Sequence, residues 1–170
     1  LGAFLFSNIT ILSLDLSNNE IEFISNQTFT NLFGLHDLSL ADNRLKKIEY
    51  IIFSLTKADI QSLKYLTVSS NKIEKLDVKF STSFQNLESL NLGQNQINYI
   101  QSGIFSNLIS LSRISLDYNK IKEFSVLNSI IFLPKFSFLV LRSNLIFQIT
   151  MEQIFKSNIS NIEFLEIDDC

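Results

Sequence analysis

The sequence has little of what builds a catalytic pocket or a disulfide framework. Its 170 residues include one cysteine, one histidine, one proline, four glycines and no tryptophan. A single cysteine excludes an internal disulfide framework, and four scattered glycines leave no glycine-rich loop for binding phosphate. The formal net charge is −3, so no basic excess attracts a nucleic acid or an acidic membrane surface. Apolar runs are short, such as residues 130–133, so no segment resembles a membrane-spanning helix.

The chain also offers no set of residues typical of catalysis. Its one histidine, His36, has no cysteine partner, and no arrangement of serine, histidine and aspartate can be argued from the sequence. Glu166, Asp168 and Asp169 form an acidic group that is more typical of a solvated edge than of a cation site. We therefore expect a protein that is not an enzyme and has no cofactor and no metal site, with His36 solvated at the start of a strand.

What the sequence does contain is a repeat. Asparagines recur every 24 to 28 residues within one apolar frame, LxxLxLxxNxL, in which L stands for an apolar residue. The frame is filled six times, and the recurring asparagines are Asn19, Asn43, Asn71, Asn95, Asn119 and Asn144. A seventh frame begins at Ile162 and has Cys170 in the asparagine position. Self-similarity with this period predicts a repeat protein.

Stacking of the repeats is needed because one repeat cannot bury its own apolar face. Stacked repeats share a continuous core, and their strands pair in parallel along one side. The two-residue period of a strand sends Leu38 and Leu40 inward, while Asp37, Ser39 and Ala41 face outward. An asparagine amide carries donors and an acceptor, so in the bend after each strand it can satisfy backbone groups of neighbouring coils. The six asparagines are therefore predicted to form a structural ladder.

The stretches between the frames carry a second pattern. Phe-x-x-Leu-x-x-Leu occurs at residues 29–35 and 105–111, and we expect its phenylalanines to fill the convex side. The step from Leu35 to Leu63 is 28 residues long, longer than the usual 24. We expect its extra residues, at 54–59, to form an enlarged convex loop.

This arrangement resembles the leucine-rich repeat family over essentially the whole chain, in the 24-residue class typical of animal extracellular proteins such as Toll-type and adhesion receptors. The proline-containing repeat of plant receptors and the shorter repeats of bacterial effectors do not fit. The resemblance implies an α/β fold, a right-handed horseshoe-shaped solenoid with a parallel β-sheet on its concave face and irregular or short helical convex segments. Residues 1–170 would form a single array of about seven repeats, starting near residues 11, 35, 63, 87, 111, 136 and 162.

The two ends of the array suggest an interior part of a longer protein. Extracellular arrays of this family are capped by cysteine-rich modules, whereas this chain has one cysteine and no signal peptide. Cys170 then has two interpretations, which the sequence leaves open. It is either a small buried residue in the asparagine position or half of a disulfide in a cap beyond this chain.

A repeat protein without catalytic groups is expected to act through its exposed strand face, where variable side chains of successive repeats form rows. This face is small and polar toward the N-terminus, and aromatic and charged in the last three repeats. Exposed aromatic side chains beside arginine are typical of interface hot spots. The candidate ligand-binding residues are therefore Arg113, Asp117, Tyr118, Phe138, Val140 and Arg142. An equally open alternative is that this face is solvated and the ligand binds elsewhere.

Three N-glycosylation sequons, at Asn8, Asn26 and Asn158, lie outside the strands. About three are expected by chance in this composition, so the resemblance to the family carries more weight than the number of sequons.

The resemblance implies a protein-binding segment of an extracellular or cell-surface protein in innate immunity or cell adhesion. Its partner would be a protein ligand or co-receptor and not a nucleic acid. The resemblance is also compatible with a homodimer. Any membrane attachment would lie in segments outside this chain. Two alternatives stay open: a cytosolic scaffold or regulatory protein without glycans, and a structural matrix protein that self-associates.

Overall fold

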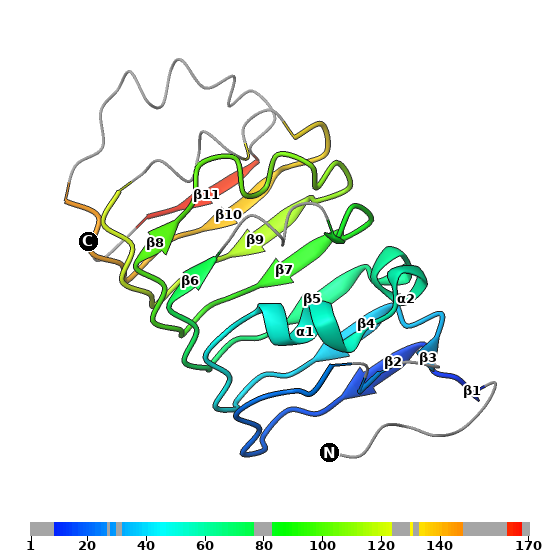
Figure 1. Cartoon of the computed structure of the whole chain (residues 1–170). Helices are drawn as coiled ribbons and strands as arrows, with labels where there is room; N and C mark the ends of the chain where they lie inside the picture. Colours follow the sequence, from blue (N-terminus) through cyan, green and yellow to red (C-terminus); the bar gives the residue numbers. More distant parts are fainter. Residues whose placement is uncertain are drawn as a thin grey trace.

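The computed structural model describes residues 9–26, 28–29, 32–76, 83–123, 130, 133–147 and 163–167. Its main element is a seven-stranded parallel sheet in the order β11-β10-β9-β7-β5-β4-β2. The strands are Ser13–Asp15 (β2), Asp37–Ser39 (β4), Tyr65–Thr67 (β5), Ser89–Asn91 (β7), Arg113–Ser115 (β9), Phe138–Val140 (β10) and Phe164–Glu166 (β11). Figure 1 shows them side by side along one elongated array. The predicted solenoid with a parallel sheet is confirmed.

The strands of successive repeats pair in register. Leu38, in the centre of β4, lies opposite Leu14 of β2 and Leu66 of β5, and the equivalent central residues pair through to β11. Leu38 and Leu40 are 2% and 0% exposed, whereas the residues at 37, 39 and 41 are only half-buried. The predicted alternation is therefore confirmed, and the register brings equivalent side chains of every repeat into rows.

The asparagines after the strands connect neighbouring coils. Asn71 Nδ2 donates to the carbonyl of Leu40 in the preceding coil at 2.9 Å and to two carbonyls of its own coil. Its Oδ1 accepts the backbone N–H of Leu45 at 2.9 Å. The same bonds to the preceding coil are made by Asn43, Asn95, Asn119 and Asn144. These five asparagines are buried, whereas the side chain of Asn19 is exposed and, within the described part of the chain, donates only to carbonyls of its own coil.

The rest of each coil is held by buried phenylalanines and short elements. Phe29 and Phe105 are fully buried, as expected of the Phe-x-x-Leu pattern. Phe84 is also fully buried, and it occupies the position that Leu108 holds in its own repeat. These side chains join the framework leucines in one continuous hydrophobic core. Two small parallel sheets support the coils, formed by Ile9–Thr10 (β1) with Leu32–Phe33 (β3) and by Lys75–Leu76 (β6) with Tyr99–Ile100 (β8).

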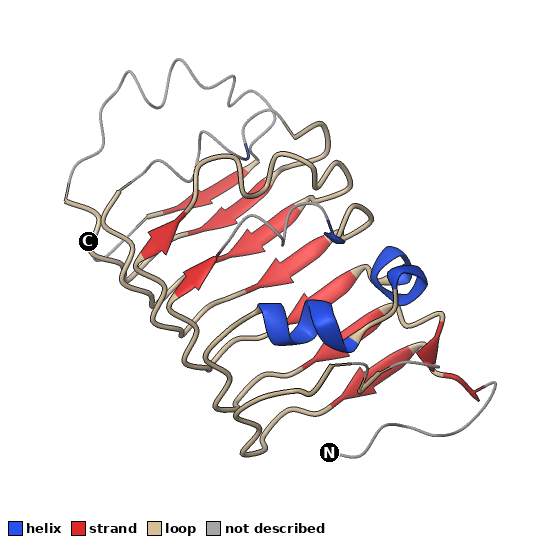
Figure 2. Ribbon diagram, viewed as in Figure 1, coloured by secondary structure: helices blue, strands red, loops and turns tan. Residues whose placement is uncertain are grey.

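The long repeat between β4 and β5 contains two short helices, Glu49–Ser54 (α1) and Lys57–Ser62 (α2), which Figure 2 shows in blue. The prediction of an enlarged loop at residues 54–59 is therefore wrong, because most of these residues belong to the end of α1 and the start of α2. Thr56 is the N-cap residue of α2. Its side chain accepts the N–H of Asp59, and the Asp59 carboxylate accepts the N–H of Thr56. This reciprocal capping box is a helix-start signal that was present in the sequence.

Candidate functional site

The candidate binding surface is the sheet face, by which we mean the outward face of the seven-stranded sheet. The first residues of the strands form one row, Ser13, Asp37, Tyr65, Ser89, Arg113, Phe138 and Phe164. The third residues form another, Asp15, Ser39, Thr67, Asn91, Ser115, Val140 and Glu166. The N-terminal strands carry small or polar side chains in both rows apart from Tyr65 of β5, whereas β9, β10 and β11 carry Arg113, Phe138, Phe164 and Glu166.

Arg113, Phe138 and Phe164, which we call the aromatic stack, follow one another in the first row. The rings of Phe138 and Phe164 are nearly parallel, with centroids 4.4 Å apart and 8° between their planes. The guanidinium carbon of Arg113 lies 4.7 Å from the centroid of Phe138, which is a cation–π distance. Phe138 lies between the other two in strand order and is half-buried, whereas Arg113 and Phe164 are exposed. Arg113 and Phe164, the two outer members of the aromatic stack, therefore offer surface for contact with a partner.

Tyr118 and Arg142 form a second contact, beyond the carboxyl ends of β9 and β10. The guanidinium carbon of Arg142 lies 5.8 Å from the centroid of the Tyr118 ring. Arg142 Nη1 also lies 3.5 Å from Glu166 Oε1, so an ion pair within the sheet face compensates the charge of this arginine. The Nε atom of Arg142 is buried and has no hydrogen-bond partner among the residues that the structure describes.

The backbone of Tyr118 adopts the left-handed conformation, with φ at 51°. The same bend follows the other strands, where the left-handed residues are Asn18, Asp42, Ser70, Gln94 and Ser143, with φ between 52° and 55°. Asparagine and aspartate tolerate this conformation better than a bulky residue does. A tyrosine held there with 50% of its side chain exposed is an outlier that points to a role for the side chain.

The carboxylate of Asp117 is already engaged within the protein. Its Oδ1 accepts a hydrogen bond from the Ser115 hydroxyl. A Cβ atom at Gly93 would collide with this oxygen and lie 3.1 Å from Asp117 Cγ, so the carboxylate packs directly on the backbone of the neighbouring coil. Asp117 is half-buried next to Tyr118, with one carboxylate oxygen held in place by Ser115.

Val140 differs from the other candidates because its side chain is only 8% exposed. The expectation of an exposed valine is therefore wrong. Val140 lies on the sheet face, opposite Ser115 and Glu166. The two-residue period of the strand places Phe138 and Arg142 on the same face at either side of it, and we attribute its burial to these larger side chains.

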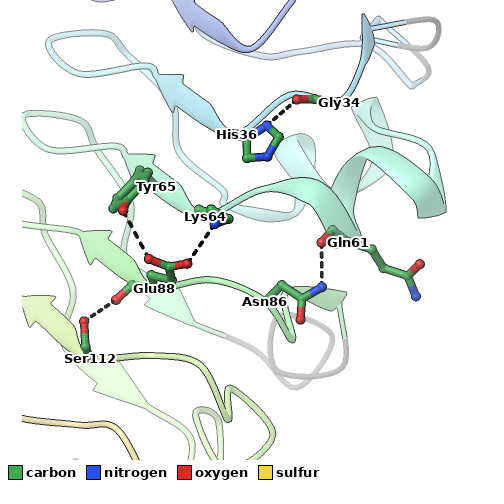
Figure 3. A network of polar contacts seen from close by, with 8 residues as sticks. All are labelled: Gly34, His36, Gln61, Lys64, Tyr65, Asn86, Glu88 and Ser112. Atoms are coloured by element: carbon green, nitrogen blue, oxygen red, sulfur yellow. Dashed lines mark hydrogen bonds and ion pairs between the residues drawn. The ribbon is translucent and has the colours of Figure 1, made fainter.

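Sequence reasoning missed a polar network at the amino-terminal ends of the strands (Figure 3). The Tyr65 hydroxyl donates to Glu88 Oε2 at 3.1 Å, and Lys64 Nζ lies 3.2 Å from Glu88 Oε1. The hydrogen bond from Lys64, followed by that from Tyr65, lowers the pKa of Glu88, and Glu88 in turn raises the pKa of Tyr65. The available signal was the row of residues that follow the first framework leucine of each repeat, at positions 36, 64, 88 and 112.

His36 belongs to this last row and is half-buried. Its Nδ1 lies 2.5 Å from the carbonyl oxygen of Gly34, which places the ring against the preceding turn, where φ of Gly34 is 80° (Figure 3). The expected position at a strand start is correct, but the ring is bonded to the backbone as well as partly solvated. Within the described ranges, no group of three or more His, Cys, Asp and Glu side chains could hold a metal ion.

One of the three sequons lies in the described part of the chain. Asn26 is exposed in a turn, and the buried hydroxyl of Thr28 donates to the Ser25 carbonyl at 2.8 Å. Asn8 and Asn158 lie outside the described residues, as do Asp168, Asp169 and Cys170. Of the helices that the structure describes, none has the length and apolar character needed to cross a bilayer.

Comparison with known proteins agrees with this architecture. Residues 61–121 match the family described as Leucine rich repeat. Keratocan from Mus musculus is 32% identical over 110 residues, covering 65% of this chain and 30% of keratocan. Osteomodulin from Mus musculus is 29% identical over 115 residues, covering 66% of this chain and 26% of osteomodulin.

A solved structure with the same fold is the crystal structure of TLR13 in complex with ssRNA13. It superposes with a TM-score of 0.69 at 27% identity, covering 94% of this chain and 23% of TLR13. The chain thus spans less than a third of the length of each of these proteins. The recurring frame and the parallel ladder of strands form a leucine-rich repeat solenoid, and these similarities support an extracellular type of leucine-rich repeat protein.

Proposed function

We propose that this chain is a protein-binding part of an extracellular leucine-rich repeat protein, a receptor or an adhesion protein, and that it recognises a protein ligand through the sheet face without catalysis. The observation that carries this proposal is the group of exposed side chains within or just after the last three strands of the sheet. Tyr118 and Phe164 are 50% and 42% exposed, and each lies beside an arginine contact. Exposed aromatic residues next to arginine are the residue types that dominate interface energies.

The dimensions of the sheet face suit a protein partner. Seven strands at a spacing of about 4.8 Å span about 29 Å, which accommodates a standard interface of about 800 Å² per partner. The surface is rigid, because each strand pairs with its neighbours and the buried asparagines connect the coils. A rigid surface loses little conformational freedom on binding, which favours recognition by surface complementarity.

The charges favour a protein over a nucleic acid. TLR13 was solved with single-stranded RNA, but this chain has a net charge of −3. Near its sheet face, Lys64 pairs with Glu88 and Arg142 pairs with Glu166. Since nucleic-acid affinity depends on neutralising several phosphates, these compensated cations support a protein ligand.

The proposed extracellular location is supported by the similarity to keratocan, osteomodulin and TLR13 and by the exposure of Asn26 in its sequon. Membrane attachment would then depend on segments outside this chain. The cytosolic scaffold or regulatory protein is the alternative, and it predicts no glycan at any sequon.

Site-directed photocrosslinking tests the binding surface. A photoreactive benzoyl-phenylalanine replaces Tyr118 or Phe164 in the intact protein, which is irradiated in its native extracellular medium. Tyr99 of β8 is the matched control, because it is 56% exposed and lies outside the seven-stranded sheet. We expect the same partner protein to be crosslinked from positions 118 and 164 and not from 99. Equal crosslinking from all three positions, or none from the sheet face, would contradict the proposal.

A further inference from the structure

The cations near the sheet face differ in whether they have a partner. Both carboxylate oxygens of Glu88 are occupied, one by Lys64 and one by Tyr65. Arg142 is paired with Glu166 at 3.5 Å. Among the described residues, Arg113 makes no ion pair. Its guanidinium is exposed and contacts the ring of Phe138.

The contact with Phe138 fixes the guanidinium without using its donors. A cation–π contact attracts the guanidinium to the ring face and does not use its N–H groups as hydrogen-bond donors, so they stay available to another partner. Phe138 is itself fixed by the parallel ring of Phe164 at 4.4 Å. The side chain of Arg113 is therefore held in one orientation before binding, which reduces the entropy lost when its donors are used.

The geometry points to a specific partner chemistry for Arg113, in an inference that rests on the proposed function. We propose that Arg113 is the anchor for an Asp or Glu side chain of the protein ligand, and that an apolar side chain of the same ligand covers Phe164. A planar guanidinium matches a carboxylate through two parallel hydrogen bonds. The uncompensated charge of Arg113 gives the complementarity that selects an acidic group over a neutral one.

The spacing of the two contacts limits the sequence of the ligand. Arg113 on β9 and Phe164 on β11 are separated by two strand spacings, or about 10 Å. An extended peptide rises about 3.3 Å per residue. A ligand segment lying across the strands would therefore carry its acidic and apolar residues about three positions apart.

A peptide-display selection on the intact protein tests this inference. Random dodecapeptides are selected, and individual binders are remade with Glu→Gln or Asp→Asn. Each pair is measured on wild type, on Arg113→Gln and Arg113→Lys, and on Arg44→Gln as the matched control, because Arg44 is exposed, pairs with Glu20 and lies outside the rows of the sheet face. We expect neutralising the peptide to weaken binding about tenfold on wild type and on Arg44→Gln, but not on Arg113→Gln. Arg113→Lys should fall between, since lysine keeps the charge and loses the planar pair of donors.

The outcomes separate this inference from the proposed function. If neutralising the peptide has the same effect on Arg113→Gln as on wild type, the carboxylate contact is overturned. The proposed function then stands if Tyr118→Ser and Phe164→Ser still abolish binding. If the peptides bind the Tyr118→Ser and Phe164→Ser variants as tightly as wild type, or if no binder is found, both proposals fail. Concentration-dependent self-association in analytical ultracentrifugation that Arg113→Gln removes would assign the carboxylate to a second copy of this chain and overturn the separate ligand.

Discussion

The side-chain oxygen of Asn71 accepts the backbone N–H of Leu45 at 2.9 Å, although the two residues are 26 positions apart. Leu45 is completely buried, so water cannot replace this acceptor. The amide group of the same asparagine donates to the carbonyl of Leu40. One side chain thus serves a donor and an acceptor of the preceding coil that strand pairing leaves without partners.

Replacing Asn71 with alanine is expected to destabilise the protein by about 1–3 kcal/mol, because it leaves the N–H of Leu45 buried without an acceptor and removes one of the two side-chain hydrogen bonds to the carbonyl of Leu40. The measurement is the free energy of unfolding from denaturant titration. Asn19→Ala is the matched control, since the Asn19 side chain is exposed and, among the described residues, donates only to carbonyls of its own coil, and it should cost clearly less. Equal costs for the two variants would refute the connecting role of the ladder.

Tyr118→Asn is expected to raise stability by about 1 kcal/mol, because asparagine tolerates the left-handed backbone at φ 51° better than tyrosine. The same variant should weaken ligand binding. Tyr99→Asn is the control for losing an exposed tyrosine, and it should not stabilise. A loss of stability in Tyr118→Asn would show that the tyrosine is kept for packing and not for binding.

Gly93→Ala is expected to cost about 1 kcal/mol, because the new methyl group displaces the Asp117 carboxylate and breaks its hydrogen bond with Ser115. The cost should fall in the background of Asp117→Ala, which removes the carboxylate atoms that the methyl group meets. A double-mutant cycle of unfolding free energies measures this coupling. An additive cycle would mean that Gly93 is required for another reason.

The pKa of Glu88 is expected to rise toward its ordinary value of 4.5 in Lys64→Met, and by less in Tyr65→Phe, because Lys64 makes the larger contribution to lowering it. Carbon-detected NMR titration of the carboxylate measures the shift. Lys120→Met should leave it unchanged, since Lys120 bonds to Gln96.

The sign of the pH effect follows from the lowered pKa of Glu88. The network stabilises the fold fully above the ordinary pKa, and this contribution is lost as the pH falls through the lower, folded-state pKa. In Lys64→Met, stability should therefore depend less on pH below about pH 4.5. An unaltered acid limb in this variant would count against the network.

The fold was largely predictable because it depends on residues that repeat. The frame positions determine which side chains are buried, and the asparagine interval determines the register that pairs Leu14, Leu38 and Leu66. The helices of the long repeat were missed because their signal is local and occurs once, in the capping box of Thr56 and Asp59.

The site was less predictable because it depends on contacts between variable side chains. The rows placed Arg113 and Phe138 next to each other correctly, but the stacking with Phe164 and the burial of Val140 depend on side-chain size and rotamer. The network joins Glu88, just before β7, with Lys64 and Tyr65 at the start of β5. A period of two along each strand does not reveal such a contact.

The most direct test of the account is the intact mass of the native protein before and after enzymatic removal of N-glycans, with peptide mapping at Asn8, Asn26 and Asn158. A binding surface of an extracellular protein must pass through the secretory pathway, where exposed sequons acquire glycans. The account predicts a mass loss on enzyme treatment and an occupied Asn26. Three bare asparagines would contradict it and favour the cytosolic scaffold.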